Sequence, residues 1–416
     1  MKTLPSRRRL VILAVVVLML AAFGCNLSDL ESKAPPTPDA FATVYAQMTL
    51  DAQADLPSQT PAPPLEATPT VAPASPTAEV SGPAESPRYR GFMVVNGARF
   101  TAFDFDANRL GFDADASGIE WLGESNTSVF AGGLAYSRFE DGGVTVVTES
   151  GRSLLDFIRS SDSISAQVSP DGSQIAWAYQ LWDGAVPASE VWMANMDGSQ
   201  QRKLAEISAA ENADRWLVYH IVGWTADGRV LFATQPTGIG GYILYGGWNG
   251  MEVFDPASGV GSVLVDDSEM LGLSLNGVSD DLRQAAISSE GIRVRTLSSG
   301  VEVALPLQGD QNVCGSGKFS PSGVWLAYGC GRNNPENEAG QIMLAPVDGS
   351  SRPQVLYNDS ANAPRVLGWL DEETILFQTY DAFGSGVASI WKIQRDGTRA
   401  TRLLEGFFLG FIPAGE

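Results

Sequence analysis

Short apolar segments alternate with tight polar turns along most of the chain beyond residue 90. The stretch VSPDGSQIAWAYQ at residues 168–180 shows the pattern, and its outline returns at residues 222–235, 318–330 and 367–380. Each copy holds a short apolar run, a polar turn and a second apolar run. Runs of this length bounded by Gly, Pro, Asp and Ser predict pairs of antiparallel β-strands.

The polar turns share one chemistry. In SPDG, Pro170 suits the second position of a type I turn, Asp171 suits the third, and Gly172 suits the left-handed position that follows. TADG at residues 225–228 and SPSG at residues 320–323 repeat this arrangement. The repeat predicts the same tight connection in each copy.

A second family of turns follows the hairpins, so each repeating unit has four strands, A, B, C and D. The units recur at a period of roughly 40–50 residues, which is typical of the blades of a β-propeller. The second turns are NMDGS at 195–199, DPASG at 255–259, LSSG at 297–300, PVDGS at 346–350 and QRDGT at 394–398.

Counting the units predicts an all-β propeller with seven four-stranded blades. Two fragments remain: residues 407–413 (FFLGFIP) copy the A strand at 365–371 (RVLGWLD), and residues 91–115 supply strands B, C and D. Pairing both ends of the domain in one blade leaves no open sheet edge. A six-bladed ring is the main alternative. The complete units span 119–158, 164–207, 221–265, 275–307, 318–357 and 366–404.

The repeats SPDG…IAWA and SPSG…LAYG resemble those of TolB-type and dipeptidyl-peptidase-type propellers, the WD40-like class. The resemblance covers most of the domain and implies the fold. It does not imply one function, because such propellers serve as binding platforms, as accessory domains of peptidases and as enzymes. The shared residues are turn formers, so no catalytic residue carries over.

The N-terminal residues predict export. Lys2 and three arginines precede an apolar run at residues 10–23, and Gly24 and Cys25 follow it. The layout resembles a bacterial lipoprotein signal, although AAFGC matches that pattern imperfectly. We expect residues 1–24 to be a signal peptide and Cys25 to be lipidated, which would anchor the chain to the outer face of a membrane. An uncleaved anchor is the alternative.

The amino-acid composition separates a Pro-rich segment from the propeller domain in the rest of the chain. Residues 25–87 are rich in Pro, Ala, Thr and Ser, so we expect a disordered stalk, and residues 88–416 form the propeller domain. The formal net charge is −21. A surface so acidic repels nucleic acid and anionic lipids, so we expect contact with the membrane through the lipid alone.

Candidate chemistry is sparse. His220 is the chain's one histidine, and no G-x-S-x-G motif accompanies it, which argues against a Ser-His-Asp triad and multi-histidine metal sites. Residues 104–115 resemble a calcium loop, but Arg109 stands where the loop needs glycine. A strand–turn–strand explains them without metal. We expect no catalytic residue, no metal and no cofactor.

Two further cysteines lie symmetrically about the SPSG turn. Cys314 and Cys330 are equidistant from Ser322, and residues equidistant from a hairpin turn face each other. An exported location permits oxidation, so we expect a disulfide. A bulge at Gly323 would shift the register and favour two free thiols, which is the alternative.

Loop length suggests where a partner binds. The B–C connections at residues 180–190, 235–250, 329–341 and 379–389 are long, as is the D–A connection at 206–220. B–C and D–A connections emerge on one side of a propeller, which we call the long-loop face, and A–B and C–D turns emerge on the tight-turn face. Long loops on a rigid scaffold often carry recognition. The candidate binding residues are Trp182, Trp216, His220, Tyr242, Tyr245, Trp248, Arg332 and Tyr380.

Three functions remain open. The first is a surface-tethered, non-enzymatic binding or scaffold propeller whose protein or glycan partner meets the long-loop face. The second is an enzyme that acts on a glycan or peptide with carboxylates near the axial channel. The third is a subunit of a cell-envelope complex whose acidic surface meets a basic partner.

Overall fold

The structure is a computed structural model of the chain. It describes residues 88–119, 126–183, 186–237, 244–270, 274–289, 291–332, 334, 339–380 and 387–414. The predicted signal peptide, Cys25 and the stalk lie outside the described residues. None of the described helices is long and apolar enough to cross a membrane.

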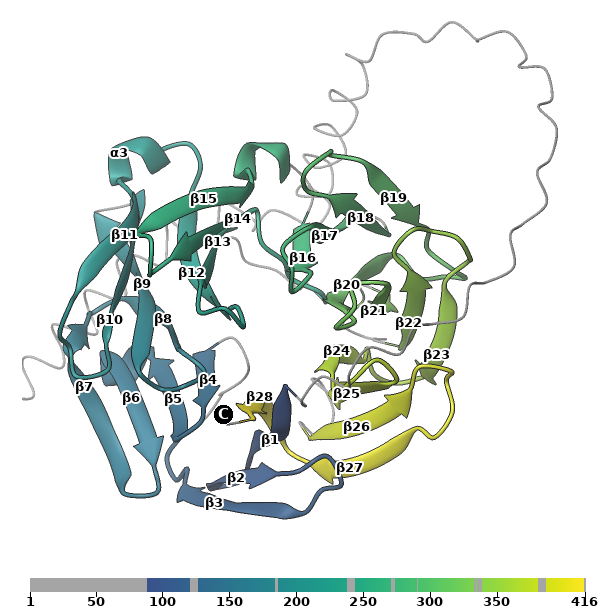
Figure 1. Cartoon of the computed structure of the whole chain (residues 1–416), viewed down its shortest axis with the longest axis horizontal. Helices are drawn as coiled ribbons and strands as arrows, with labels where there is room; N and C mark the ends of the chain where they lie inside the picture. The colour runs from purple at the N-terminus through teal and green to yellow at the C-terminus, as the bar shows by residue number, and fades with distance from the viewer. Residues whose placement is uncertain are drawn as a thin grey trace, which may run out of the picture. The chain divides into compact units, whose positions relative to one another are not determined.

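The described residues form seven four-stranded antiparallel sheets arranged as a ring, with one strand of each sheet at the centre (Figure 1). This confirms the predicted seven-bladed propeller, and the six-bladed alternative is wrong. From the inner strand outward, the first blade holds β28 (Phe407–Pro413), β1 (Tyr89–Asn96), β2 (Arg99–Phe103) and β3 (Arg109–Asp115), and the second holds β4 (Thr127–Phe130), β5 (Gly133–Arg138), β6 (Gly143–Thr148) and β7 (Gly151–Arg159). The third blade holds β8 (Ser163–Val168), β9 (Gln174–Asp183), β10 (Val186–Asn195) and β11 (Arg202–Ile207), the fourth holds β12 (Leu217–Trp224), β13 (Val230–Pro236), β14 (Gly250–Asp255) and β15 (Val260–Val265), and the fifth holds β16 (Ser274–Val278), β17 (Gln284–Ser288), β18 (Ile292–Thr296) and β19 (Glu302–Leu305). The sixth blade holds β20 (Val313–Phe319), β21 (Trp325–Gly331), β22 (Gly340–Pro346) and β23 (Gln354–Asp359), and the seventh holds β24 (Arg365–Trp369), β25 (Thr374–Tyr380), β26 (Ala388–Gln394) and β27 (Thr401–Glu405).

Pairing between the two ends of the domain closes the ring, as predicted. β28 lies antiparallel to β1, with Phe411 opposite Phe92 and Phe408 opposite Val94. The side chains of Phe92 and Phe408 are buried in one cluster with Leu376 and Ile390 of the seventh blade. Closure therefore joins the chain ends and seals the contact between the first and seventh blades.

The A–B turns adopt the predicted geometry. Gly172 has a φ of 77° and Gly323 a φ of 71°, the left-handed region that glycine enters without steric cost. In the third blade, the Ser169 hydroxyl donates to Asp171 Oδ1 at 2.6 Å and accepts from the Gln174 amide at 2.9 Å. Thr225 and Ser279 hold the turns of the fourth and fifth blades through the same contacts to Asp227 and Asp281.

Five of the seven inner strands contain a one-residue bulge next to a glycine, whereas β4 and β8 pair with their neighbours without a register shift. The register shifts just before Gly223, Gly277 and Gly368, and beside Gly317 and Gly410. At Gly277, an added Cβ would lie 2.5 Å from the backbone oxygen of Gly317 in the next inner strand. These glycines let neighbouring inner strands approach closely around the axis.

Cys314 and Cys330 are joined by a disulfide between β20 and β21, with Cα atoms 4.1 Å apart. The pairing depends on the bulge at Ser316 and Gly317. Near the turn Lys318 faces Ala327, a register that would place Cys314 opposite Gly331, and the bulge shifts it so that Cys314 faces Cys330. The expected disulfide is therefore present, and a bulge at Ser316 and Gly317 creates its register; the alternative of two free thiols, which a bulge at Gly323 would have favoured, is wrong.

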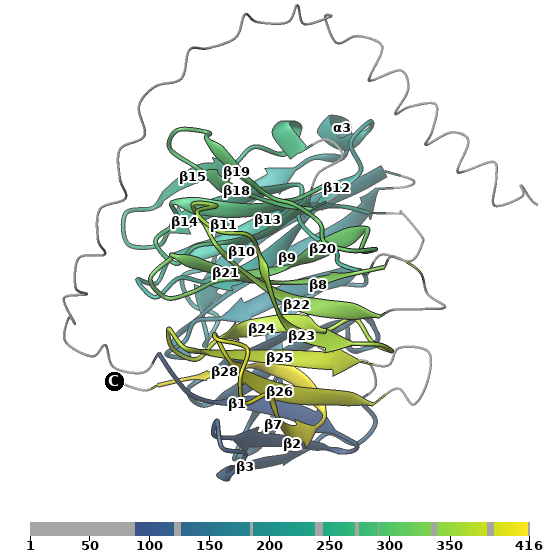
Figure 2. The ribbon, with the colours of Figure 1, turned by 90° about the vertical axis from the view of Figure 1, so that its right-hand side faces the viewer.

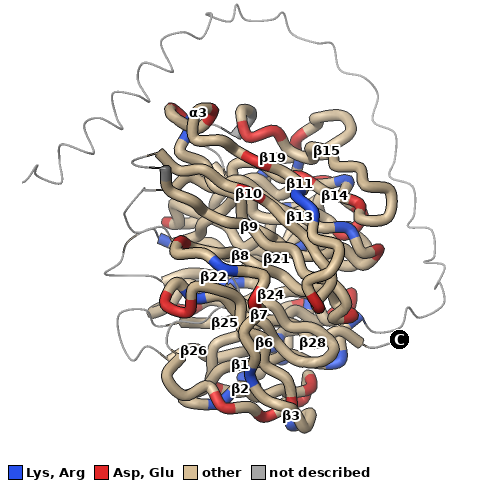
Figure 3. The backbone as a smooth tube through the Cα atoms, turned by 90° about the vertical axis from the view of Figure 1, so that its left-hand side faces the viewer, with Lys and Arg blue, Asp and Glu red and all other residues tan. Residues whose placement is uncertain are grey.

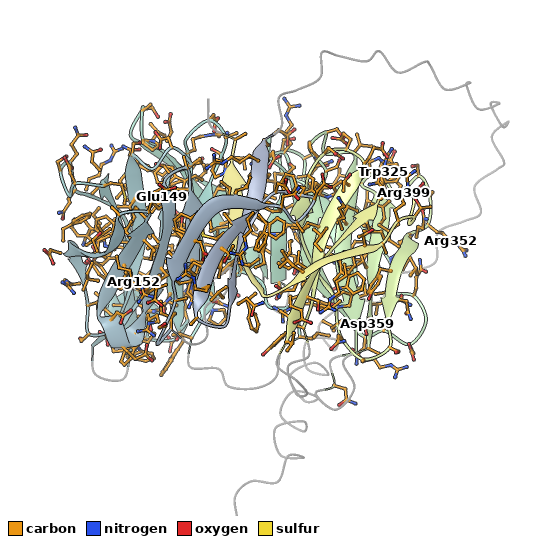
Figure 4. All side chains as sticks on the ribbon, turned by 90° about the horizontal axis from the view of Figure 1, so that it is seen from below. Glu149, Arg152, Trp325, Arg352, Asp359 and Arg399 are labelled. Atoms are coloured by element: carbon orange, nitrogen blue, oxygen red, sulfur yellow. A yellow bond between two sulfur atoms is a disulfide. The ribbon has the colours of Figure 1, made fainter. Side chains whose placement is uncertain are left out.

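The ring has two distinct faces. Figure 4 views the ring edge-on and places Trp325, the first residue of β21, towards one face and Asp359, the last residue of β23, towards the other. The domain begins and ends on the tight-turn face, where the Ala414 amide donates to the Arg88 carbonyl at 3.1 Å. In Figure 2 the C-terminus lies to the left, while α3 (Ala209–Asn212) and the end of β25 lie to the right. The chain therefore enters on the face opposite the long connections.

Charged side chains of both signs are interspersed over the outer strands and turns in the view of Figure 3. Many form exposed ion pairs within one blade, such as Arg99 with Asp113 and Lys203 with Glu190. Exposed pairs of this kind contribute little to stability. The fold is held by the apolar layers between blades, where Trp177, Phe232 and Phe377 are almost wholly buried.

Candidate functional site

A cavity of about 2600 Å³ occupies the centre of the ring, and residues from all seven blades line it. Its wall is formed mainly by the inner strands and by the ends of the second strands. The two ends of this cavity differ in chemistry, so each is described separately below.

Side-chain carboxylates at the tight-turn end are engaged with neighbouring groups. Arg88 of the first blade forms an ion pair with Asp280 of the fifth blade, on the far side of the ring. Glu372 accepts hydrogen bonds from the amide and the hydroxyl of Ser322, the latter at 3.0 Å. Asp371 accepts from the amides of its own turn. These carboxylates stabilise turns or bridge blades.

Neutral polar and aromatic side chains meet on one side of the long-loop end, which Arg138, Glu140 and Arg365 line elsewhere. Gln180 of β9 lies with Nε2 3.0 Å from Nε2 of His220 in β12, and the Trp248 ring centroid is 5.4 Å from that of His220. Burial lowers the pKa of His220 to about 4. The imidazole is therefore neutral at neutral pH and accepts a hydrogen bond from the Gln180 amide.

Two tryptophans lie beyond this group on the outer side of the same face. Trp182 and Trp216 meet edge to face with ring centroids 6.1 Å apart, and they are 44% and 38% exposed. Tryptophan side chains are largely buried in most proteins, so two neighbouring exposed rings form an unusual apolar surface.

The other candidate residues have different environments. Tyr245 is buried, and its hydroxyl donates to the Pro364 carbonyl at 3.0 Å, so it packs the connection after β13 onto the ring. Arg332 forms an ion pair with Asp310. Tyr380 lines the cavity and packs edge to face against Phe407. Tyr242 lies outside the described residues.

Two of the candidate residues, Trp182 in β9 and His220 in β12, lie on strands where we had expected long connections. β9 and β10 pair as far as Asp183 and Val186, because no turn-forming residue interrupts residues 174–182. β12 begins at Leu217 and contains His220, which we had placed before the strand. Because both side chains project from paired strands, their positions are set by sheet geometry.

Sequence reasoning missed two residues at this end of the ring, Gln180 and Asn212. Gln180 precedes Trp182 by two positions, so an alternating strand pattern would have placed both on one face. Asn212 is fully buried, and its Nδ2 donates to the carbonyls of Pro187 and Leu217 at 2.7 Å. No sequence pattern distinguishes it from a solvated loop asparagine.

The calcium-like segment forms the predicted strand–turn–strand of β2 and β3. The Asp104 carboxylate accepts from the amides of Asp106 and Asn108 and from the side chain of Asn108, which together lower its pKa. Its oxygens thus serve the turn itself. Among the described residues, no three His, Cys, Asp or Glu side chains cluster as a metal site would require.

Comparisons with known proteins found similar solved structures. No family model matches the sequence, and no curated protein matches it. Similar solved structures include a TolB-like protein from Agrobacterium tumefaciens, with 17% identity over 69% of this chain and 91% of that chain, and a TM-score of 0.39. TolB from Acinetobacter baumannii has 12% identity over 77% of this chain and 80% of that chain, and a TM-score of 0.38.

A prolyl endopeptidase structure is also similar, with 10% identity and a TM-score of 0.49. The match covers 77% of this chain and 50% of the endopeptidase chain. At these identities the likeness concerns the fold alone. The chain is a seven-bladed β-propeller with TolB-like and other propeller neighbours.

Proposed function

We propose that this chain is an exported, lipid-anchored binding propeller whose partner meets the long-loop face. The observation that carries the proposal is the contrast between the two faces. Exposed tryptophans and neutral polar side chains gather on the long-loop face, whereas the domain begins on the tight-turn face beside the Arg88–Asp280 ion pair. The chain joins the propeller at Arg88, on the tight-turn face.

The anchor follows from the N-terminal signal and is tested by mass spectrometry of the mature chain. We expect a mature N-terminus at Cys25 that carries fatty-acyl chains. An intact Met1 or an unmodified N-terminus at another residue would contradict the anchor, while the proposal for the binding face would stand.

The binding face is tested by attaching the chain to a resin in two orientations. The mature chain with Cys25→Ser is coupled through one new cysteine, either Val324→Cys in the tight turn before β21 or Val387→Cys in the connection before β26. Val324 is 52% exposed and Val387 is 41% exposed, so the two variants are matched for access. Cys314 and Cys330 are buried and joined, so they do not compete for coupling.

We expect the Val324→Cys resin to retain a partner from envelope extract and the Val387→Cys resin to retain much less. Coupling at Val387 places the long-loop face against the matrix and blocks it. Equal capture in both orientations, or capture by the Val387→Cys resin alone, would show that the partner does not use this face. No capture on either resin would contradict a binding role.

A further inference from the structure

One crevice on the long-loop face combines exposed tryptophan rings with neutral hydrogen-bonding groups. Trp182 and Trp216 meet where the third and fourth blades adjoin, and Gln180, His220 and Trp248 line the central cavity. We call these five side chains the tryptophan crevice. Gln180 and Trp182 are two positions apart on β9, and therefore on one face of that strand. The Trp182–Trp216 contact therefore lies nearer the end of β9 than the Gln180–His220 contact does.

A buried asparagine fixes the two tryptophan-bearing segments to each other. Trp182 lies opposite Pro187 in the β9–β10 hairpin, and the Pro187 carbonyl accepts from Asn212 Nδ2. The same amide donates to the Leu217 carbonyl, while Asn212 Oδ1 accepts from the Leu217 amide at 2.9 Å. Trp216 immediately precedes Leu217. Three hydrogen bonds from one side chain therefore hold the rings in place without either ring being buried.

Trp216 also has an unusual backbone conformation. Its φ is 53°, the left-handed region that bulky residues rarely adopt. The backbone is held there by its amide, which donates to the Asn212 carbonyl at 3.1 Å, and by its carbonyl, which accepts from the Thr237 amide at 2.8 Å. Strain held by the surrounding structure at an exposed aromatic residue points to a site organised before its ligand arrives.

The uncharged aromatic and amide side chains of the tryptophan crevice indicate the kind of ligand that it binds. All five side chains are uncharged, and an amide offers both donors and an acceptor. A sugar hydroxyl also donates and accepts, and the C–H face of a pyranose packs on an aromatic ring. Building on the proposed function, we propose that the tryptophan crevice binds a neutral, pyranose-based oligosaccharide, with sugar rings against Trp182 and Trp216 and hydroxyls towards Gln180 and His220.

A proline-rich peptide, such as the chain's own stalk, is the competing ligand because it also packs on tryptophan. Proline residues offer carbonyl acceptors and no amide donor, so the prolines that pack on the rings would themselves bring no donor to the acceptors of the crevice. A hydroxyl-rich ligand satisfies both the donors and the acceptors. The crevice therefore fits the saccharide better.

The test measures saccharide binding to the mature Cys25→Ser chain by calorimetry and tryptophan fluorescence. The probes are chitotetraose, cellotetraose and maltotetraose, with tetragalacturonate as the anionic counterpart and a synthetic peptide of residues 57–87. We expect a neutral tetrasaccharide to bind with a Kd of about 1 mM or tighter. Trp182→Ala and Trp216→Ala should each weaken binding about tenfold.

Two variants serve as controls. Phe139→Ala removes a ring that is 64% exposed on the same face, in the B–C connection of the second blade, and should leave binding unchanged. Trp216→Tyr keeps an aromatic ring and should retain most of the affinity. Melting temperatures of all variants check that the fold is intact.

The proposal is overturned if none of the neutral saccharides binds, if tetragalacturonate or the stalk peptide binds more tightly, or if both alanine variants bind like the parent. A protein partner retained in the resin experiment together with no saccharide binding would leave the proposed function standing and remove this inference. Saccharide binding together with no capture on either resin would leave this inference standing and show that the ligand is not a protein of the extract.

Discussion

At the scale of single residues, His220 links the site to the stability of the fold. Its pKa falls from 6.5 to about 4 because burial disfavours the imidazolium. The folded-state pKa is therefore below the unfolded-state pKa, and the unfolded chain binds more protons between these values. The stability contributed by the neutral ring is complete above pH 6.5 and is lost as the pH falls towards 4.

His220→Gln should flatten this part of the pH dependence. Between pH 7 and pH 4 the parent should lose about 3 kcal/mol more unfolding free energy than the variant, because glutamine does not titrate there. Urea unfolding at pH 7, 5.5 and 4 measures the difference. The turn carboxylates titrate equally in both proteins, so parallel curves would mean that the imidazole is protonated in the folded state.

At the scale of elements, the bulge next to a glycine is the feature that shapes the inner strands. It recurs in β12, β16, β20, β24 and β28, and in each case the glycine follows or adjoins the register shift. A bulge bends the strand and increases its twist, and glycine removes the side chain that would meet the adjacent strand. Together they let these five inner strands bend towards the central cavity.

Gly277→Ala should destabilise the domain by about 1–3 kcal/mol. The new Cβ would lie 2.5 Å from the Gly317 carbonyl oxygen, a backbone atom that cannot move without shifting β20. Gly246→Ala is the matched control, because nothing lies within 4 Å of the Cβ it would add. Denaturant unfolding compares the two variants. Equal midpoints would show that the inner strands are not closely packed at this position.

At the scale of the whole molecule, ring closure makes the two ends of the domain interdependent. β28 is the inner strand of the first blade, and Phe408, Leu409 and Ile412 are buried against neighbouring blades. A ring that lacked β28 would expose the edge of β1 and the apolar surface of two blades. Exposed edges of this kind promote aggregation.

Removing residues 407–416 should therefore lower the unfolding free energy by several kcal/mol and promote aggregation. Removal of residues 414–416 alone is the control, because it leaves β28 intact and, among the described residues, removes the Ala414–Arg88 hydrogen bond. Thermal melting and light scattering report both effects. If the longer truncation melts like the parent, β28 does not stabilise the ring.

The sequence by itself determined the blades. Six of the seven blades are built from consecutive strands whose pairing partners lie nearby in the chain. Glycines such as Gly172 and Gly323 mark their turns through a backbone conformation that glycine favours. Even closure was predictable, because FFLGFIP copies an inner strand that the N-terminal fragment lacks. Such signals are local, so they survive without knowledge of the packing.

Only the tertiary structure decided which aromatic rings face solvent. Tyr245 is covered because Gly315 and Gly329 of the sixth blade leave room for its ring, whereas Trp182 and Trp216 meet at the surface because Asn212 ties their segments together. The pKa of His220 likewise depends on burial. Exposure and burial arise between segments distant in the chain, and no residue pattern within one repeat specifies them.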